Sequence, residues 1–75
     1  MNHIQPKDLE KGKLYLYYPS ESRCVPVIIL TVNKQQYIQP TPFFWYSITM
    51  LIGKQRYILE VREDFTGFKK FPNDD

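Results

Sequence analysis

Alternation of side chains over residues 43–52 is the feature that most narrows what this chain can fold into. Every second residue is large and apolar, in the set Phe44, Tyr46, Ile48, Met50 and Ile52. The intervening set is mixed: Phe43, Trp45, Ser47, Thr49 and Leu51. A period of two places each set on its own face of an extended strand, whereas a helix would mix them. The segment is therefore predicted to be a central strand that directs the first set into the core.

Two properties of the composition extend this prediction to the whole chain. There is no alanine, whereas tyrosine, phenylalanine, isoleucine, leucine and valine are plentiful, and most of these types favour strands. There are six prolines, several of them between apolar runs, and they would break a long helix. With 43% hydrophobic and 24% charged residues, the chain resembles folded domains rather than disordered ones. We therefore expect an all-β domain.

Further strands are predicted from apolar runs that are bounded by turn-forming residues. These strands span residues 13–18, 25–32, 36–39, 56–62 and 68–71, with turns at 19–23, 33–35 and 53–55. In the first strand, Leu14 and Leu16 are expected on one face and Tyr15 and Tyr17 on the other. The 25–32 run is apolar at nearly every position, which indicates burial on both faces or a bend. Pro26 lacks an N–H group, so that end of the strand is expected to be an edge or a bulge.

The length of 75 residues allows one domain at most. We expect residues 1–11 to be a lead-in with a single turn that begins near Pro6. Residues 12–71 are expected to form the body of the domain, and residues 72–75 a flexible tail. Within the body, residues 63–67 are predicted to make a single helical turn that Asp64 caps.

This layout resembles the SH3-like barrels, and in particular the small barrels of this type that bacteriophages encode. The resemblance is carried by the opening segment from Leu9 to Tyr15, by the long bent second strand, and by the one-turn break over residues 64–67. It implies a five- or six-stranded, partly open barrel with one short helical turn near the carboxyl terminus. It also implies a binding module, without naming the ligand. The signature by which signalling SH3 domains bind proline-rich peptides is missing, so that activity is not carried over.

The residue types that catalysis requires are scarce in this chain. Nucleophilic catalysis would require Cys24 or a serine beside a positioned base, and the only histidine is His3. A structural zinc site requires about four Cys or His ligands, and the chain has one residue of each type. There is no glycine-rich phosphate loop and no dinucleotide fingerprint. We therefore expect no enzyme activity, no bound metal and no cofactor.

The sequence also favours a cytoplasmic location. A single cysteine cannot form a disulfide within the chain, which suits a reducing compartment. The amino-terminal residues up to Lys13 are polar and include no apolar segment of signal-peptide length. The apolar run over residues 43–52 is far shorter than the roughly 20 residues needed to cross a bilayer. We expect no association with a membrane.

A protein partner is the first functional hypothesis. If one face of the 43–52 strand is buried, Phe43 and Trp45 lie on the other face, where Tyr15 and Tyr17 can join them in a strip. Contiguous exposed aromatic side chains mark contact sites. The chain would then be a non-enzymatic binding module or inhibitor that docks through this strip or through a strand edge. Self-association through residues 43–52 would give a homodimer. In the competing arrangement, a bend of the barrel buries these aromatic side chains.

A nucleic-acid partner is the alternative hypothesis. Basic side chains lie in turns beside the aromatic strands, a combination that suits base stacking and phosphate contacts. The stacking candidates are Tyr15, Tyr17, Tyr37 and Trp45, and the phosphate contacts would come from Lys13, Lys34, Lys54 and Arg56. The net charge of only +2 is small for this class of protein.

Overall fold

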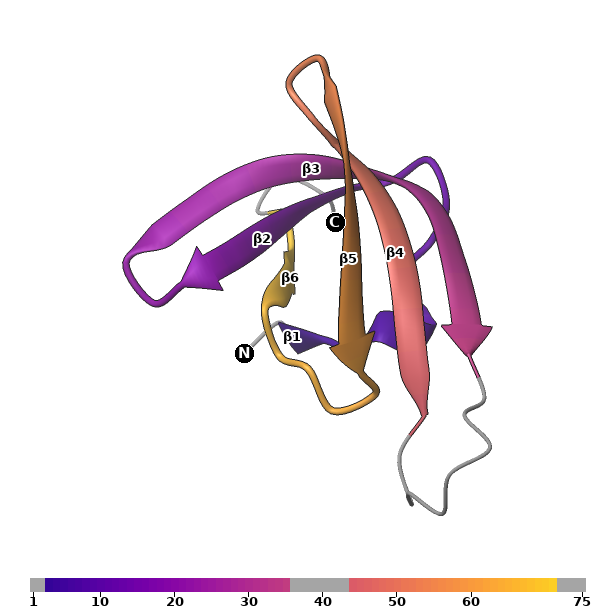
Figure 1. Cartoon of the computed structure of the whole chain (residues 1–75). Helices are drawn as coiled ribbons and strands as arrows, with labels where there is room; N and C mark the ends of the chain where they lie inside the picture. Colours follow the sequence, from indigo (N-terminus) through magenta and orange to yellow (C-terminus); the bar gives the residue numbers. More distant parts are fainter. Residues whose placement is uncertain (1–2, 36–43, 72–75) are drawn as a thin grey trace.

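A computed structural model describes residues 3–35 and 44–71, which form six strands and one 3-10 helix (Figure 1). In chain order these are β1 (His3–Ile4), η1 (Pro6–Asp8), β2 (Leu14–Ser20), β3 (Arg23–Gln35), β4 (Trp45–Ile52), β5 (Gln55–Arg62) and β6 (Phe68–Lys70). All six strands belong to one antiparallel sheet, in the order β1-β6-β2-β3-β4-β5. The edge strands β1 and β5 do not pair with each other, so the curved sheet stays open. The all-β prediction is confirmed.

β3 is the longest strand and carries much of the curvature of the sheet (Figure 1). Its first half pairs with β2 and its second half with β4. The predicted reversal of the chain at Asn33, Lys34 and Gln35 is wrong, because these residues continue β3 and pair with β4. Pairing with a neighbouring strand overrides the local turn preference of these polar residues. The predicted strand over residues 36–39 and the predicted tail over residues 72–75 lie outside the described residues.

An extra residue, Leu30, interrupts the pairing between β3 and β4. Ile29 lies opposite Met50, and Thr31 lies opposite Thr49, so Leu30 forms a β-bulge. A one-residue bulge changes which face each following side chain occupies.

The bulge explains how a continuous apolar run can serve a sheet with one buried face. Before Leu30 the core-facing residues of β3 are Val27 and Ile29, and after it Val32 packs against the core. The sequence pattern indicated burial on both faces or a bend, and the bulge provides the bend.

Pro26 lies at a position where β3 has a strand on one side only. It is opposite Leu16 of β2, whereas pairing with β4 begins at Ile28. The Ile29 N–H donates to the Lys13 carbonyl at 3.1 Å. Hydrogen-bonded and non-hydrogen-bonded pairs alternate along an antiparallel ladder, and Ile29 occupies a hydrogen-bonded position. The nitrogen of Pro26, three residues earlier, therefore faces away from β2, toward the side on which β3 has no partner strand and needs no donor. The edge predicted from the missing N–H is confirmed.

The hydrophobic core lies on the concave face of the sheet, opposite the convex face. The buried members of the core are Leu9, Tyr15, Val27, Ile29, Tyr46, Ile48, Met50, Val61 and Phe68. β4 contributes three alternate residues to this core, as the sequence predicts. The single turn expected near Pro6 is η1, which contacts β3 and β4. No helix in the described part of the chain has the length and apolar character of a membrane span.

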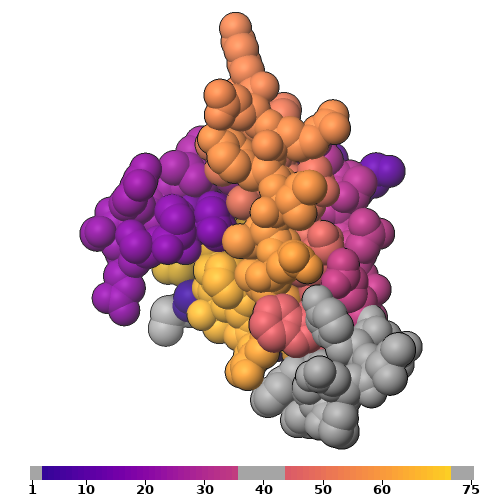
Figure 2. Space-filling model, viewed as in Figure 1, coloured from indigo at the N-terminus to yellow at the C-terminus, as the bar shows by residue number. Residues whose placement is uncertain are grey.

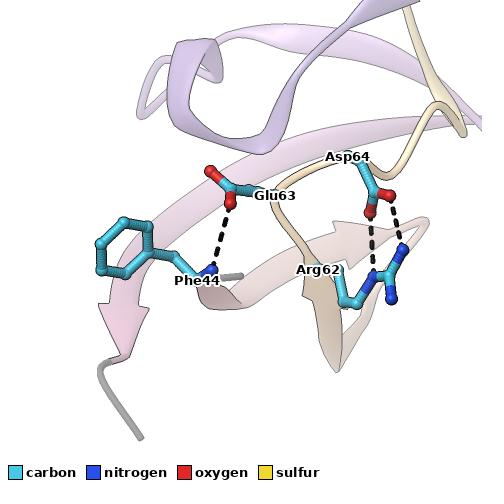
Figure 3. Close-up of polar contacts among 4 residues, drawn as sticks. All are labelled: Phe44, Arg62, Glu63 and Asp64. Carbon is cyan, nitrogen blue, oxygen red and sulfur yellow. Dashed lines mark hydrogen bonds and ion pairs between the residues drawn. The ribbon is translucent and has the colours of Figure 1, made fainter. Parts of the chain in front are cut away.

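The segment between β5 and β6 forms a hydrogen-bonded turn, so the predicted helical turn over residues 63–67 is wrong. The Phe65 N–H donates to the Arg62 carbonyl at 3.1 Å. Asp64, which was expected to cap a helix, receives two hydrogen bonds from the Arg62 guanidinium (Figure 3). The carboxylate is therefore engaged by a side chain. Among the described residues, η1 is the only helical turn.

Candidate contact surface

The described side chains of the predicted aromatic strip are divided between the two faces of the sheet. Tyr15 is only 4% exposed and lies in the core on the concave face. Trp45 is half-buried on the convex face, opposite Arg62 of β5. Phe43 lies outside the described residues. The expected exposure of Tyr15 is wrong because both faces of β2 are apolar, and the core takes the tyrosines rather than the leucines.

Tyr17 belongs to an aromatic cluster on the concave face with Phe65 and Phe68. Its ring centroid lies 6.4 Å from that of Phe65 and 5.2 Å from that of Phe68. The Phe65 and Phe68 rings meet edge to face at 5.7 Å, a geometry that aromatic quadrupoles favour. A side chain at Gly67 would overlap the Phe65 ring, so the glycine makes room for the cluster. The Phe65 and Gly67 contributions were missed, because the expected helical turn gave them another role.

The cations proposed to contact phosphates lie on both faces of the sheet. Lys34 extends over the concave face, where its Nζ lies 3.9 Å from the centroid of the Phe44 ring. Arg56 lies on the convex face of β5 and is exposed.

The remaining members of this predicted set are similarly separated. Lys13 forms an ion pair with Glu10, with 3.1 Å between Nζ and Oε2. Lys54 is exposed in the β4–β5 turn, at the opposite end of β4 from Lys34. Tyr37 lies outside the described residues. The described cations therefore do not line one continuous stripe.

β5 combines an open strand edge with strongly exposed apolar side chains. Ile58, on the convex face, is 70% exposed, and Tyr57, on the concave face, is 44% exposed. Within the described residues β5 pairs with β4 alone. The β4–β5 hairpin stands out from the body at the top of the space-filling view (Figure 2). Neither the open edge nor the exposure of Ile58 could be read from the sequence, which leaves strand order undetermined.

The hydrogen-bond pattern of the hairpin shows which backbone groups of β5 face outward. The Glu63 N–H donates to the Phe44 carbonyl at 2.9 Å. The Phe44 N–H donates to Glu63 Oε1 at 3.3 Å (Figure 3). Register is regular from this pair to the turn, and hydrogen-bonded pairs alternate along an antiparallel ladder. Residues of odd number in β5 therefore bond to β4. Arg56, Ile58 and Glu60 direct their N–H and C=O groups away from β4.

A groove of about 340 Å³ adjoins this edge on the concave side. It runs between the β2–β3 hairpin and β5, and its lining residues are Tyr17, Pro19, Arg23, Val25, Met50, Ile52, Tyr57, Ile58 and Leu59. Most of these side chains are apolar, and Arg23 carries a positive charge. An apolar groove beside an open strand edge fits an extended segment of another chain.

A second hollow, of about 470 Å³, lies near β1 and β6 and is more polar. His3 Nδ1 lies 3.0 Å from the Thr66 carbonyl oxygen, and Lys69 Nζ lies 4.8 Å from the centroid of the Tyr18 ring. A hydrogen bond with Cys24 raises the pKa of Tyr18 above its ordinary value of 10.0, and desolvation raises it further by a smaller amount. The described residues contain no group of three or more His, Cys, Asp or Glu side chains arranged to hold a metal ion.

The Arg62–Asp64 pair gives the end of β5 a fixed charge arrangement. Arg62 Nη2 lies 2.6 Å from Asp64 Oδ2, and Nε lies 3.1 Å from Oδ1. These hydrogen bonds lower the pKa of Asp64 below its ordinary value of 3.8 and raise the pKa of Arg62. The two side chains are exposed, so the pair orders the turn more than it stabilises the fold.

Comparisons with known proteins identify no relative: no family model, no curated protein and no solved structure matches this chain. Among the described residues, the β5 edge and the groove beside it form the candidate contact surface, because they combine an open strand edge with exposed apolar side chains.

Proposed function

We propose that this chain is a non-enzymatic binding module, or a small inhibitor, that docks on a protein partner through the open edge of β5. The observation that carries the proposal is the 70% exposure of Ile58 on an edge strand. Edge strands of soluble proteins are usually protected by charge, proline or cover, because an open edge pairs readily with another chain. An exposed isoleucine at the middle of such an edge favours pairing.

Strand addition is the mode of docking that this surface supports. An extended segment of the partner would receive and donate hydrogen bonds at the backbone groups of Arg56, Ile58 and Glu60. Its side chains would alternate between the two faces, so every second one would contact Tyr57 and Leu59 at the groove. Backbone pairing would supply affinity, and the groove would supply specificity.

We also propose that the sheet is an SH3-like, partly open barrel. Support comes from the curved antiparallel sheet, from the long bulged β3, and from the turn that precedes β6. A cytoplasmic location is proposed with it, because Cys24 is an exposed free thiol and a reducing compartment preserves such thiols.

Capture experiments with the full chain test the proposed docking mode. Tagged wild-type chain, incubated with soluble proteins of its native host after nuclease treatment, should retain a protein partner. Ile58→Asp should lose this partner, because a carboxylate at the centre of the edge opposes apolar contact. Asn33→Asp is the matched control: it adds the same charge at an exposed convex-face position of β3, which β4 separates from the β5 edge, and should retain the partner.

Two outcomes would contradict the proposal. Retention of the partner by Ile58→Asp would show that β5 is not the docking edge. Loss of all retained material on nuclease treatment would favour the nucleic-acid hypothesis instead, and mobility-shift titration at low salt would then measure that binding.

A further inference from the structure

We propose that the β5 edge binds a second copy of this chain, with the two β5 strands antiparallel about a twofold axis at Ile58. The inference rests on the proposed function, because it names the occupant of the same edge. A twofold interface requires a surface that is complementary to itself. The residues on either side of Ile58 meet this requirement in their backbone, their charge and their apolar side chains.

The backbone groups match when two β5 edges meet in this register. With the axis at Ile58, that residue lies opposite its own copy, and Arg56 lies opposite Glu60 of the second copy. All three positions direct their N–H and C=O groups away from β4. Each facing pair can therefore exchange two hydrogen bonds, as hydrogen-bonded pairs of an antiparallel ladder do.

Charge complementarity selects this register over its neighbours. The axis at Ile58 places Arg56 opposite Glu60 twice, once on each side of the axis, on the convex face. Moving the axis by one residue to Leu59 would place Arg56 opposite Arg62, and like charges directly opposite are destabilising. An axis at Tyr57 would place Arg56 opposite Ile58 and leave its charge unpaired. Of these three registers, the central one alone places Arg56 opposite an acidic side chain.

Apolar contacts reinforce the same arrangement on both faces. Ile58 would lie against its own copy on the convex face, which covers the most exposed of the large apolar side chains described. On the concave face Tyr57 would lie opposite Leu59 of the second copy, again twice. The two sheets would join into one continuous sheet across the dimer.

Charge-reversal variants of the purified full chain test this register. Sedimentation over a concentration series should show a dimer for the wild type and for Asn33→Asp. Arg56→Glu and Glu60→Arg each place like charges opposite one another at both pairs, and should raise the dissociation constant about tenfold or more. An equimolar mixture of these two variants should recover the dimer, because the mixed pair restores opposite charges at both positions. Unfolding curves of each variant check that the fold is intact.

A crosslink locates the axis independently. Hydrogen-bonded residues of an antiparallel pair have Cα atoms about 5.5 Å apart, a separation that a disulfide can span. Ile58→Cys in a Cys24→Ser background should therefore form a covalent dimer under mild oxidation. Thr49→Cys in the same background is the control: it lies on the same face of β4, opposite Ile58, and should stay uncrosslinked.

The outcomes separate this inference from the proposed function. A wild-type chain that is monomeric at every concentration, or variants that do not recover on mixing, would overturn self-pairing. If a host partner were still retained by the wild type and lost with Ile58→Asp, the docking edge would stand with a different occupant. A monomeric chain that retained no host protein would remove both.

Discussion

The Tyr15 hydroxyl accepts a hydrogen bond from the backbone N–H of Glu10 across 2.9 Å, which ties the start of β2 to the segment before it. Tyr15→Phe keeps the ring in the core and removes this acceptor. We expect a loss of about 1 kcal/mol in the free energy of unfolding, the usual effect of one such hydrogen bond. Chemical denaturation followed by circular dichroism measures it. An unchanged denaturation midpoint would show that water replaces the hydroxyl without cost.

Gly67 and the Phe65 ring are in contact so close that a methyl group at Gly67 would displace the ring. Gly67→Ala should lower the free energy of unfolding by about 1–3 kcal/mol, as overpacking does. The double variant Gly67→Ala/Phe65→Leu should be destabilised by less than the sum of its single variants, because the smaller side chain relieves the overlap. Strict additivity in thermal or chemical unfolding would count against this explanation.

Two isoleucines of the β4–β5 hairpin should respond very differently to truncation. Ile48 is 0% exposed in the core, so Ile48→Ala should cost about 2–5 kcal/mol of stability, a large part of what a chain of this size has. Ile58→Ala should change the stability of the monomer by less than about 0.5 kcal/mol. Denaturation midpoints at protein concentrations below the dissociation constant of the proposed dimer give both values. A large loss for Ile58→Ala would place that side chain in an intramolecular contact.

Protonation of Asp64 should weaken the turn after β5. Because Arg62 lowers the pKa of Asp64 below 3.8, the contribution of the pair is present above that pH and is lost as pH falls through the folded-state pKa. The stability difference between wild type and Asp64→Asn should therefore be small, largest near neutral pH, and absent at strongly acidic pH. Salt at about 1 M should reduce it. A difference that persists in acid would show that the amide, and not the lost charge, alters the turn.

The sequence predicts strand content and the core face of β4 well because these depend on local periodicity. In β4 one set of alternate residues is wholly apolar, so only one orientation buries them. β2 offers no such asymmetry, since Leu14 and Tyr15 are both apolar enough to be buried. The orientation of β2 is fixed by packing: the Tyr15 ring lies in the core, and its hydroxyl accepts a hydrogen bond from Glu10.

Contacts between distant segments also explain what the sequence could not give. The β5 edge follows from strand order, and strand order is set by which strands pair across the whole fold. The polar end of β3, from Asn33 to Gln35, continues as a strand because β4 lies beside it. The turn after β5 is set by Arg62, which holds the carboxylate expected to begin a helix. Each of these features depends on a partner that periodicity does not reveal.

The bulge at Leu30 gives β3 one residue more than regular pairing with β4 requires. Deleting Leu30 would leave Ile29 opposite Met50, Thr31 opposite Thr49 and Val32 opposite Ile48 in an uninterrupted ladder. Val27, Ile29 and Val32 would therefore keep their face of the sheet, and the strand would lose the local bend that a bulge introduces. Deleting a regularly paired residue of β3 would instead shift the pairing register, and a one-residue shift turns side chains to the opposite face.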